Sequence, residues 1–71
     1  MKYAIVIEKA MENYSAYVPD LPGCIATGET VEEVEAQIKE AIEFHIDGLK
    51  ADGLVVPEPV TRCKYVELAK A

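Results

Sequence analysis

The stretch YVPDLPGCIATGET, residues 17–30, places two prolines, a glycine and a cysteine between two short segments of strand-forming residues. Val18 precedes a proline, which disfavours helical backbone and suits the end of a strand. Leu21-Pro22-Gly23 offers proline at the second and glycine at the third position of a type II turn. The stretch therefore predicts a rigid reversal between two strands, with Leu21 either tucked under the turn or presented to a partner.

Segments with strand-forming composition lie on both sides of this reversal. Residues 2–9 alternate loosely between apolar and polar side chains, and residues 13–18 and 23–28 form two further short segments of this kind. Residues 60–68, VTRCKYVEL, follow a connector whose prolines favour extended backbone. We expect these four segments to be strands.

The helical signal follows directly after the third segment. The Thr30 hydroxyl can cap a helix, and Glu33 stands three residues later, as in a capping box. Apolar residues then recur at helical spacing from Val31 to Leu49, opposite an acidic face. Gly53 suits the left-handed residue that ends a helix.

The predicted order is therefore β-β-β-α-β, in the α+β class. We expect a three-stranded antiparallel meander with one helix on one face and a fourth strand pairing with the first. The whole chain, residues 1–71, is expected to be a single domain.

Composition narrows the classes of function. The net charge of −6 and the pI of about 4.6 disfavour direct nucleic-acid binding by this chain alone and suit a basic protein partner. No apolar run is long enough to span a membrane, and the N-terminus lacks the pattern of a signal peptide. We therefore expect a cytoplasmic protein, whose Cys24 and Cys63 are reduced and serve as small buried apolar residues.

The width of the predicted sheet, compared with that of one helix, leads us to expect self-association, and we call this the covering argument. One helix is about 10–12 Å across, whereas four strands make a sheet roughly 15–20 Å wide. The first and last strands are apolar on both sides, as strands buried on both faces are. Because the chain has no second layer to offer, we expect a second copy or another protein to cover the sheet.

Catalytic chemistry finds little support in the sequence. The only histidine, His45, lies within the apolar stripe of the predicted helix, and no pattern of a nucleophile with its base occurs. A metal-dependent hydrolase would need clustered carboxylates, for which Glu8 and Glu67 are the strand candidates. We expect no enzyme activity, no metal and no cofactor.

The chain resembles the HicB-like antitoxin family. Its signature is a strand, then PDLPGC, then a G-[DE]-T capped helix, and the resemblance covers nearly the whole chain. The matching residues are Tyr17, Pro19, Asp20, Leu21, Pro22, Gly23, Cys24, Gly28 and Thr30.

The resemblance implies a partial ribonuclease H-like fold without nuclease activity. It also implies an antitoxin that covers the active site of HicA, a small basic mRNA-cleaving toxin. Many members carry an additional C-terminal DNA-binding module, which we do not expect within these 71 residues.

The hypothesis is a homo-oligomeric antitoxin that occludes a HicA-like toxin by steric fit and charge. The predicted partner-binding residues are Tyr17, Pro19, Asp20, Leu21, Pro22 and Phe44. For Phe44 the alternative is an aromatic at the edge of the core, lying over the last strand. The alternative function is an orphan regulatory or scaffold oligomer that binds another protein or a small ligand.

Overall fold

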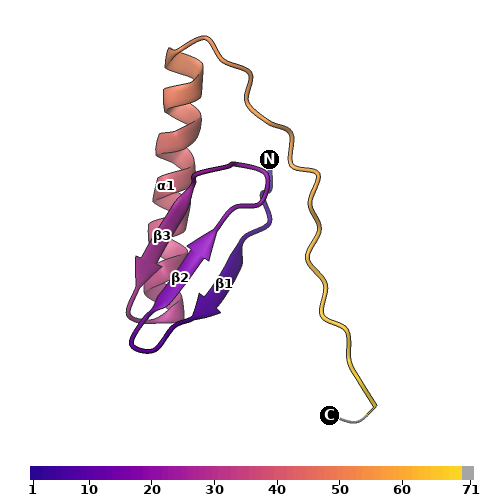
Figure 1. Cartoon of the computed structure of the whole chain (residues 1–71). Coiled ribbons are helices and arrows are strands. Elements are labelled where there is room, and N and C mark those ends of the chain that lie inside the picture. The colour runs from indigo at the N-terminus through magenta and orange to yellow at the C-terminus, as the bar shows by residue number, and fades with distance from the viewer. Residues whose placement is uncertain (70–71) are drawn as a thin grey trace.

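The computed structural model describes residues 1–69 as a small sheet with one helix and an extended C-terminal segment (Figure 1). The strands are β1 (Val6–Lys9), β2 (Tyr14–Tyr17) and β3 (Ile25–Gly28), and the helix is α1 (Val31–Ala51). The strands pair antiparallel in the order β1-β2-β3. The predicted meander and helix are confirmed, although each strand is shorter than predicted.

Both ends of α1 are closed by the residues that the sequence indicates. The Thr30 hydroxyl accepts a hydrogen bond from the Glu33 backbone N–H at 3.0 Å. At the other end Gly53 has φ +69°, and the Leu54 N–H donates to the Leu49 carbonyl at 2.8 Å. This is the Schellman arrangement, in which a left-handed glycine lets the chain turn back onto the last carbonyls.

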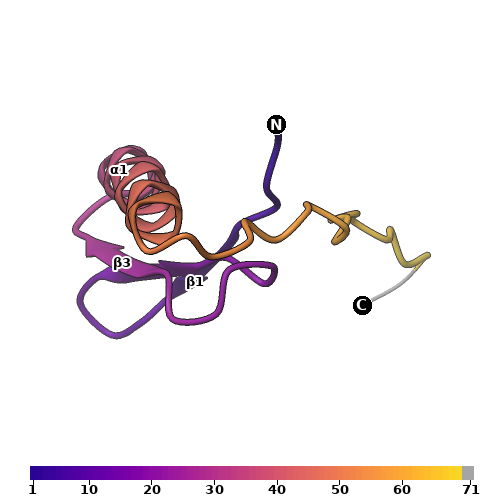
Figure 2. The same ribbon diagram turned by 90° about the horizontal axis from the view of Figure 1, so that it is seen from above.

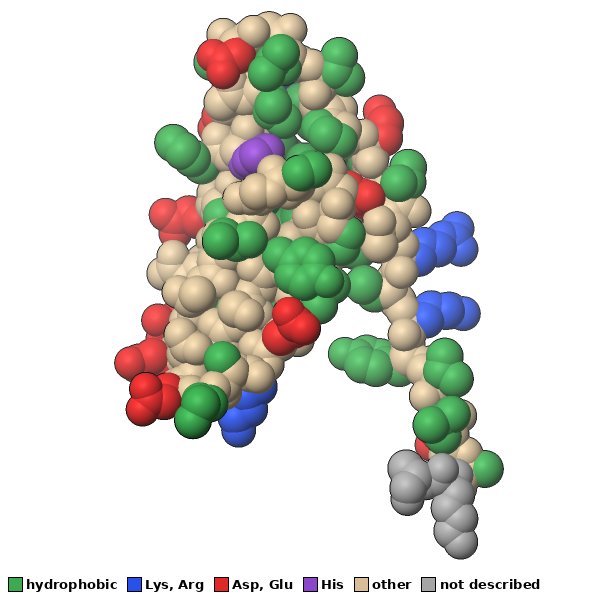
Figure 3. Space-filling model, in the orientation of Figure 1, with side chains coloured by type: hydrophobic (Ala, Val, Ile, Leu, Met, Phe, Trp, Pro, Cys, Tyr) green, Lys and Arg blue, Asp and Glu red, His purple; other side chains and the backbone are tan. Residues whose placement is uncertain are grey.

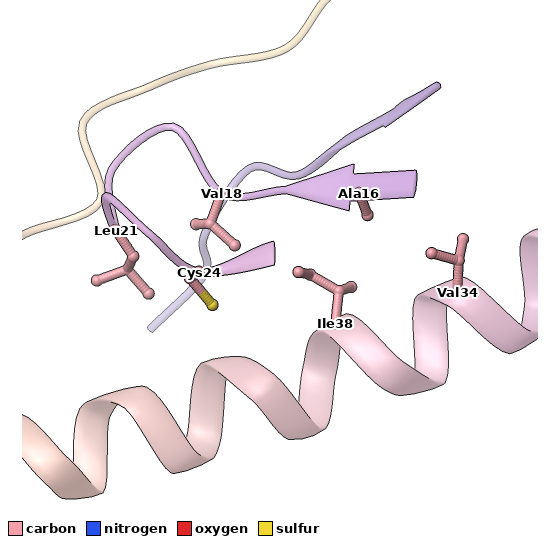
Figure 4. Packing of buried hydrophobic residues seen from close by; sticks show 6 residues of the cluster. All are labelled: Ala16, Val18, Leu21, Cys24, Val34 and Ile38. Atoms are coloured by element: carbon pink, nitrogen blue, oxygen red, sulfur yellow. The ribbon is translucent and has the colours of Figure 1, made fainter. Parts of the chain in front are cut away.

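The core lies between α1 and one face of the sheet, and Figure 2 shows the helix over that face alone. The buried apolar residues come from β2, from the turn after it and from α1. They are Ala16, Val18, Leu21, Cys24, Val34 and Ile38 (Figure 4). The helix packs against β2 and β3, and none of the described residues forms a layer over the other face of the sheet.

Gly28 sets how closely the helix start approaches β3. A Cβ atom built on Gly28 would lie 2.7 Å from the Val34 backbone nitrogen and 3.0 Å from its Cα atom. Real Cβ atoms do not approach backbone atoms so closely. The glycine therefore permits the contact between the end of β3 and the first turn of α1.

The predicted fourth strand does not form within the single chain. Residues 54–68 have neither helix nor strand structure, and among the described residues no backbone hydrogen bond joins them to β1. They run as an extended segment, drawn in orange to yellow in Figure 1, away from the sheet and the helix. We call the sheet and the helix together the body. The radius of gyration is accordingly 14.0 Å, whereas a compact chain of this length has about 11 Å.

Candidate partner-binding surface

The PDLPG stretch folds as two consecutive tight turns. The Leu21 N–H donates to the Val18 carbonyl, and the Cys24 N–H donates to the Leu21 carbonyl, both at 3.1 Å. Gly23 has φ +84°, as the third position of a type II turn requires. The predicted reversal is confirmed, and its geometry turns Leu21 inward.

Leu21 is therefore a core residue and not part of the exposed surface. Its side chain is fully buried beside Val18 and Cys24, and it points toward α1 (Figure 4). Of the two alternatives left open by the sequence, the structure has the one in which Leu21 tucks under the turn. Burial also raises the pKa of the Cys24 thiol above its ordinary value.

Asp20 bonds to the C-terminal segment of its own chain. One carboxylate oxygen, Oδ2, accepts from the backbone N–H groups of Val60 at 3.0 Å and Thr61 at 2.9 Å. The other, Oδ1, accepts from the Thr61 hydroxyl at 2.7 Å. We call these bonds the Asp20 tether, and they fix the place where the extended segment leaves the body.

The tether changes the acidity of Asp20. The backbone and side-chain hydrogen bonds from Thr61 stabilise the charged carboxylate, and Val60 adds to them, so the pKa of Asp20 is lowered although partial burial opposes the shift. A second anchor lies earlier in the segment, where the Tyr3 hydroxyl donates to the Pro57 carbonyl. Burial raises the pKa of the Tyr3 phenol, and the nearby carboxylates of Glu58 and Asp20 add to that effect.

The face of the sheet that α1 does not cover carries an apolar row. Val6, Tyr17 and Ile25 stand opposite one another in the register of the three strands. The side chains of Tyr17 and Ile25 are 41% and 70% exposed. Figure 3, which views the molecule as in Figure 1, shows hydrophobic side chains gathered over the strands. This exposed row agrees with the covering argument.

A groove beside β3 brings an aromatic side chain among carboxylates. It has a volume of about 590 Å³ and runs between the outer edge of β3 and α1. Phe44 projects there with 82% of its surface exposed, near Ile25. Three acidic residues of the helix, Glu40, Glu43 and Asp47, line the same groove. We call these residues the Phe44 groove.

The predicted partner-binding residues are thus divided between three places. Tyr17 lies in the exposed apolar row, and Phe44 lies in the Phe44 groove, which Ile25 of that row also lines. Pro22 is exposed at the tip of the double turn, and Pro19 is half-buried beside the tether. Asp20 and Leu21 serve the fold of this chain, because one holds the C-terminal segment and the other fills the core.

Sequence reasoning missed two parts of this surface. The sequence predicts a strand at Ile25 but not which face its side chain takes, and the exposure of Ile25 follows from its register with Tyr17. The hydrogen bonds of Thr61 could not be predicted from local sequence, because its partner Asp20 lies 41 positions away. The expectation that Cys63 is buried is wrong, since its thiol is exposed and its Sγ atom lies 3.9 Å from the Ile5 carbonyl oxygen.

Within residues 1–69, no three His, Cys, Asp or Glu side chains come together in a way that could hold a metal ion. None of the helices in that range is long and apolar enough to cross a membrane.

Comparison with known proteins identifies the family. Residues 3–69 match the family described as the HicB-like antitoxin of bacterial toxin-antitoxin systems. The chain belongs to the HicB-like antitoxin family. The resemblance seen in PDLPGC and in the capped helix is therefore confirmed.

Two relatives and one solved structure place this HicB-like chain more closely. An uncharacterized 14.9 kDa protein of Haemophilus phage HP1 is 45% identical over 58 residues, covering 82% of this chain and 44% of the phage protein. A UPF0150 protein of Helicobacter pylori is 49% identical over 49 residues, covering 69% of this chain and 68% of that protein. The HicB-like chain thus spans less than half of the phage relative.

The structural likeness concerns a toxin–antitoxin complex. A chain in the structure of the HicA3 and HicB3 toxin-antitoxin complex superimposes with a TM-score of 0.73 and 33% sequence identity, covering 84% of this chain and 70% of that chain. The three antiparallel strands and single helix of the HicB-like chain therefore agree with a fold found in such a complex.

Proposed function

We propose that this HicB-like chain acts as a non-enzymatic antitoxin. It binds a small basic HicA-like mRNA-cleaving toxin, covers its active site, and works as a homo-oligomer in the cytoplasm. Membership of the family and the likeness to a chain from a toxin–antitoxin complex support the class of function. The net charge of −6 supports a basic partner.

The observation that carries the proposal is the exposed Phe44 among carboxylates. Aromatic residues, phenylalanine included, are enriched in protein interfaces relative to the rest of the protein surface. Glu40, Glu43 and Asp47 surround it with the sign of charge that attracts a basic toxin. In the part of the chain that the structure describes, the outer edge of β3, beside the same groove, is unpaired.

The test measures toxin affinity for matched variants. The probe is a small basic HicA-like protein encoded beside the gene, purified as a catalytically inactive variant. Phe44→Ala is expected to weaken binding by roughly 30-fold, the effect of losing about 2 kcal/mol at an interface anchor. Met11→Ala is the control, because Met11 is 99% exposed in the turn between β1 and β2, away from the groove.

Charge reversal separates electrostatic fit from folding. Glu43→Lys is expected to weaken binding and to reduce its dependence on salt, while Glu12→Lys, an equal change of charge outside the groove, has a smaller effect. Equal affinity for the wild type and for Phe44→Ala and Glu43→Lys would contradict the assignment of the groove. Failure of the wild type to bind any neighbouring basic protein would contradict the antitoxin function itself.

A second candidate function rests on another groove. Tyr3, Ile5, Ile42 and Ile46 line an apolar space of about 480 Å³ between the β1 side of the sheet and α1. This is within the usual size range of small-ligand sites. An orphan regulatory or scaffold oligomer could use this space for a small ligand or a protein side chain. The absence of a small basic reading frame next to the gene would favour this alternative.

The proposal includes the absence of nuclease activity. Glu8, the strand carboxylate considered for a hydrolase, stands opposite Ser15 in the register, and Ser15 stands opposite Thr27. Neither neighbour supplies a second carboxylate. A nuclease assay with Mg²⁺ or Mn²⁺ is expected to show no cleavage, and cleavage that Glu8→Gln abolishes would refute this part.

A further inference from the structure

We propose that residues 62–69, here called the C-terminal arm, form a strand with a second copy of the chain. In the resulting dimer, each arm lies between β1 and the arm of the other copy. We call this arrangement the exchange, and the dimer the exchanged dimer. This inference rests on the homo-oligomeric part of the proposed function and identifies the segment responsible. The partial ribonuclease H-like order β-β-β-α-β is then completed between chains and not within one.

The arm has the composition of a strand but lacks the partners of one. Tyr65, Val66 and Leu68 are exposed, although their side chains suit a buried strand. Among the described residues, the arm donates no backbone hydrogen bond to the body. The Asp20 tether holds Val60 and Thr61 in place, so the arm leaves the body at a defined point.

The structure leaves room for a strand beside β1. Within residues 1–69, the outer edge of β1 is unpaired, because β1 pairs only with β2. A space of about 430 Å³ separates Ile5, Val6 and Ile7 from the first part of the arm, residues 62–65. A strand edge with free backbone groups is a template for pairing with another chain. This space is therefore where an inserted strand gains hydrogen bonds on both of its sides.

Direction and symmetry agree with the exchange. The arm and β1 run the same way along the molecule, as Figure 1 shows by the arrow of β1 and the orange-to-yellow course of the segment. A two-fold axis perpendicular to the sheet makes the two arms antiparallel to each other. The arm of the second copy is then antiparallel to β1 on one side and to the first arm on the other. Every pairing in the joined sheet becomes antiparallel.

The distribution of charge favours a second copy of this chain, and not a basic toxin, as the partner of the arm. Residues 1–59 carry twelve acidic and four basic side chains, whereas the arm carries Arg62 and Lys64 against Glu67 alone. Basic side chains project from this segment in Figure 3. A basic toxin would meet like charge at the arm, but the acidic body of a second copy attracts it.

The side chains of the arm can cover both faces of the sheet if the arm is a strand. Successive residues in a strand point to opposite faces, so Tyr65 and Val66 face opposite sides. One side chain lies on the face that carries the exposed row of Val6 and Tyr17. The other lies on the face with the apolar groove lined by Ile5. An inserted arm thereby covers apolar surface on each side of β1.

The first test compares two proline variants by light scattering after size-exclusion chromatography. In the exchanged dimer each arm is a central strand, which does not tolerate proline, so Val66→Pro is expected to be monomeric. Val55→Pro is the control and is expected to remain dimeric. Val55 is 86% and Val66 82% exposed, and the Val55 N–H donates no hydrogen bond among the described residues.

The second test locates the arm directly. Isotope-labelled and unlabelled chains are mixed, and isotope-filtered nuclear Overhauser effects are recorded between the Tyr65 ring and the Val6 methyl groups. Intermolecular effects are expected. Effects that are only intramolecular, a monomeric wild type, or a dimer that Val66→Pro leaves intact would each overturn the exchange.

The arm and the toxin surface can be tested independently. Val66→Pro retains the Phe44 groove, so its binding to the inactive toxin tests the antitoxin function without the exchange. A Val66→Pro monomer that binds the toxin supports the exchange and the toxin-binding part of the proposed function. A dimeric wild type with intermolecular Tyr65 contacts that binds no toxin supports the exchange and contradicts the antitoxin function.

Discussion

At the scale of single residues, neighbouring side chains of the PDLPG stretch have different structural roles. Leu21 turns inward because the two consecutive turns reverse the chain on either side of it. Asp20, its neighbour, turns toward the C-terminal segment and collects three hydrogen bonds. Pro22 stays exposed at the tip. One short motif therefore stabilises the core, anchors a distant segment and presents a surface.

The burial of Leu21 leads to a stability prediction. Leu21→Ala leaves a cavity among Val18, Cys24 and Ile38, so the free energy of unfolding is expected to fall by about 2–5 kcal/mol. Urea denaturation measures the change. Met11→Ala, at a 99% exposed position, is expected to stay within about 0.5 kcal/mol of the wild type. Unchanged stability of Leu21→Ala together with loss of toxin binding would show that Leu21 is a partner contact after all.

The Asp20 tether is expected to depend on pH. The pKa of Asp20 in the folded chain is lower than its ordinary value of 3.8, since Thr61 and Val60 donate to the carboxylate. A lowered pKa means that the tether stabilises the fold fully above the unfolded-state pKa, and that this contribution is lost as the pH falls through the folded-state value. Amide hydrogen exchange at Val60 and Thr61 is therefore expected to be slow relative to an unstructured chain until strongly acidic pH.

Two variants control the pH experiment. Asp20→Ala is expected to accelerate exchange at Thr61 at pH values above the folded-state pKa of Asp20, where the wild-type carboxylate is charged. It is also expected to abolish the rise in exchange on acidification, here called the acid transition. Glu58→Ala removes a carboxylate that accepts no hydrogen bond from the segment among the described residues, so the transition should remain. An acid transition that survives in Asp20→Ala would assign the pH dependence to another group.

At the scale of elements, the helix is well specified and the strands are short. Helix α1 has a capped start, a Schellman end and an apolar stripe that meets β2 and β3. Each strand has only four residues, which gives the sheet little stability of its own. The contact between helix and sheet therefore determines how well the body holds together.

Replacing Gly28, just before α1, and Gly48, within α1, by alanine is expected to change the free energy of unfolding in opposite directions. Gly28→Ala places a Cβ atom against the Val34 backbone and is expected to lower the free energy of unfolding by about 1–3 kcal/mol. Gly48→Ala meets nothing within 4 Å and adds a good helix former, so it is expected to raise stability by about 0.5–1 kcal/mol. Thermal and urea unfolding of both variants measures the pair, and equal shifts would show that the close approach at Gly28 relaxes freely.

At the scale of the whole molecule, the single chain leaves too much apolar surface in water. The arm residues Tyr65, Val66 and Leu68 are exposed, and so are Ile25 and Phe44. Domains of this size derive only a few kcal/mol from a single core. Association covers part of this surface and adds stability that one chain lacks.

An exchanged dimer predicts that thermal stability depends on protein concentration. Because unfolding then separates two chains, each tenfold dilution is expected to lower the midpoint by roughly 5 °C. Calorimetry over a hundredfold range of concentration measures this shift. Val66→Pro should melt at a lower midpoint that dilution does not change, and a wild-type midpoint that is independent of concentration would contradict obligate association.

Local sequence determined much of this protein. The double turn from Val18 to Cys24, the Thr30 cap and the stripe of α1 could all be predicted, because each depends on residues only a few positions apart. The order of the first four elements followed from these signals. The family was recognisable from the same PDLPGC turn and capped helix.

Only the tertiary structure decided where Asp20, Leu21 and the segment of residues 60–68 lie. The local sequence pattern predicts that a segment favours strand backbone. It does not predict whether the unpaired edge of a sheet lies close enough for the segment to pair with it. The Asp20 tether joins residues about forty positions apart, and the segment that it holds does not pair with β1 among the described residues. Pairing and burial of this kind depend on where distant parts of the chain meet, which no local pattern records.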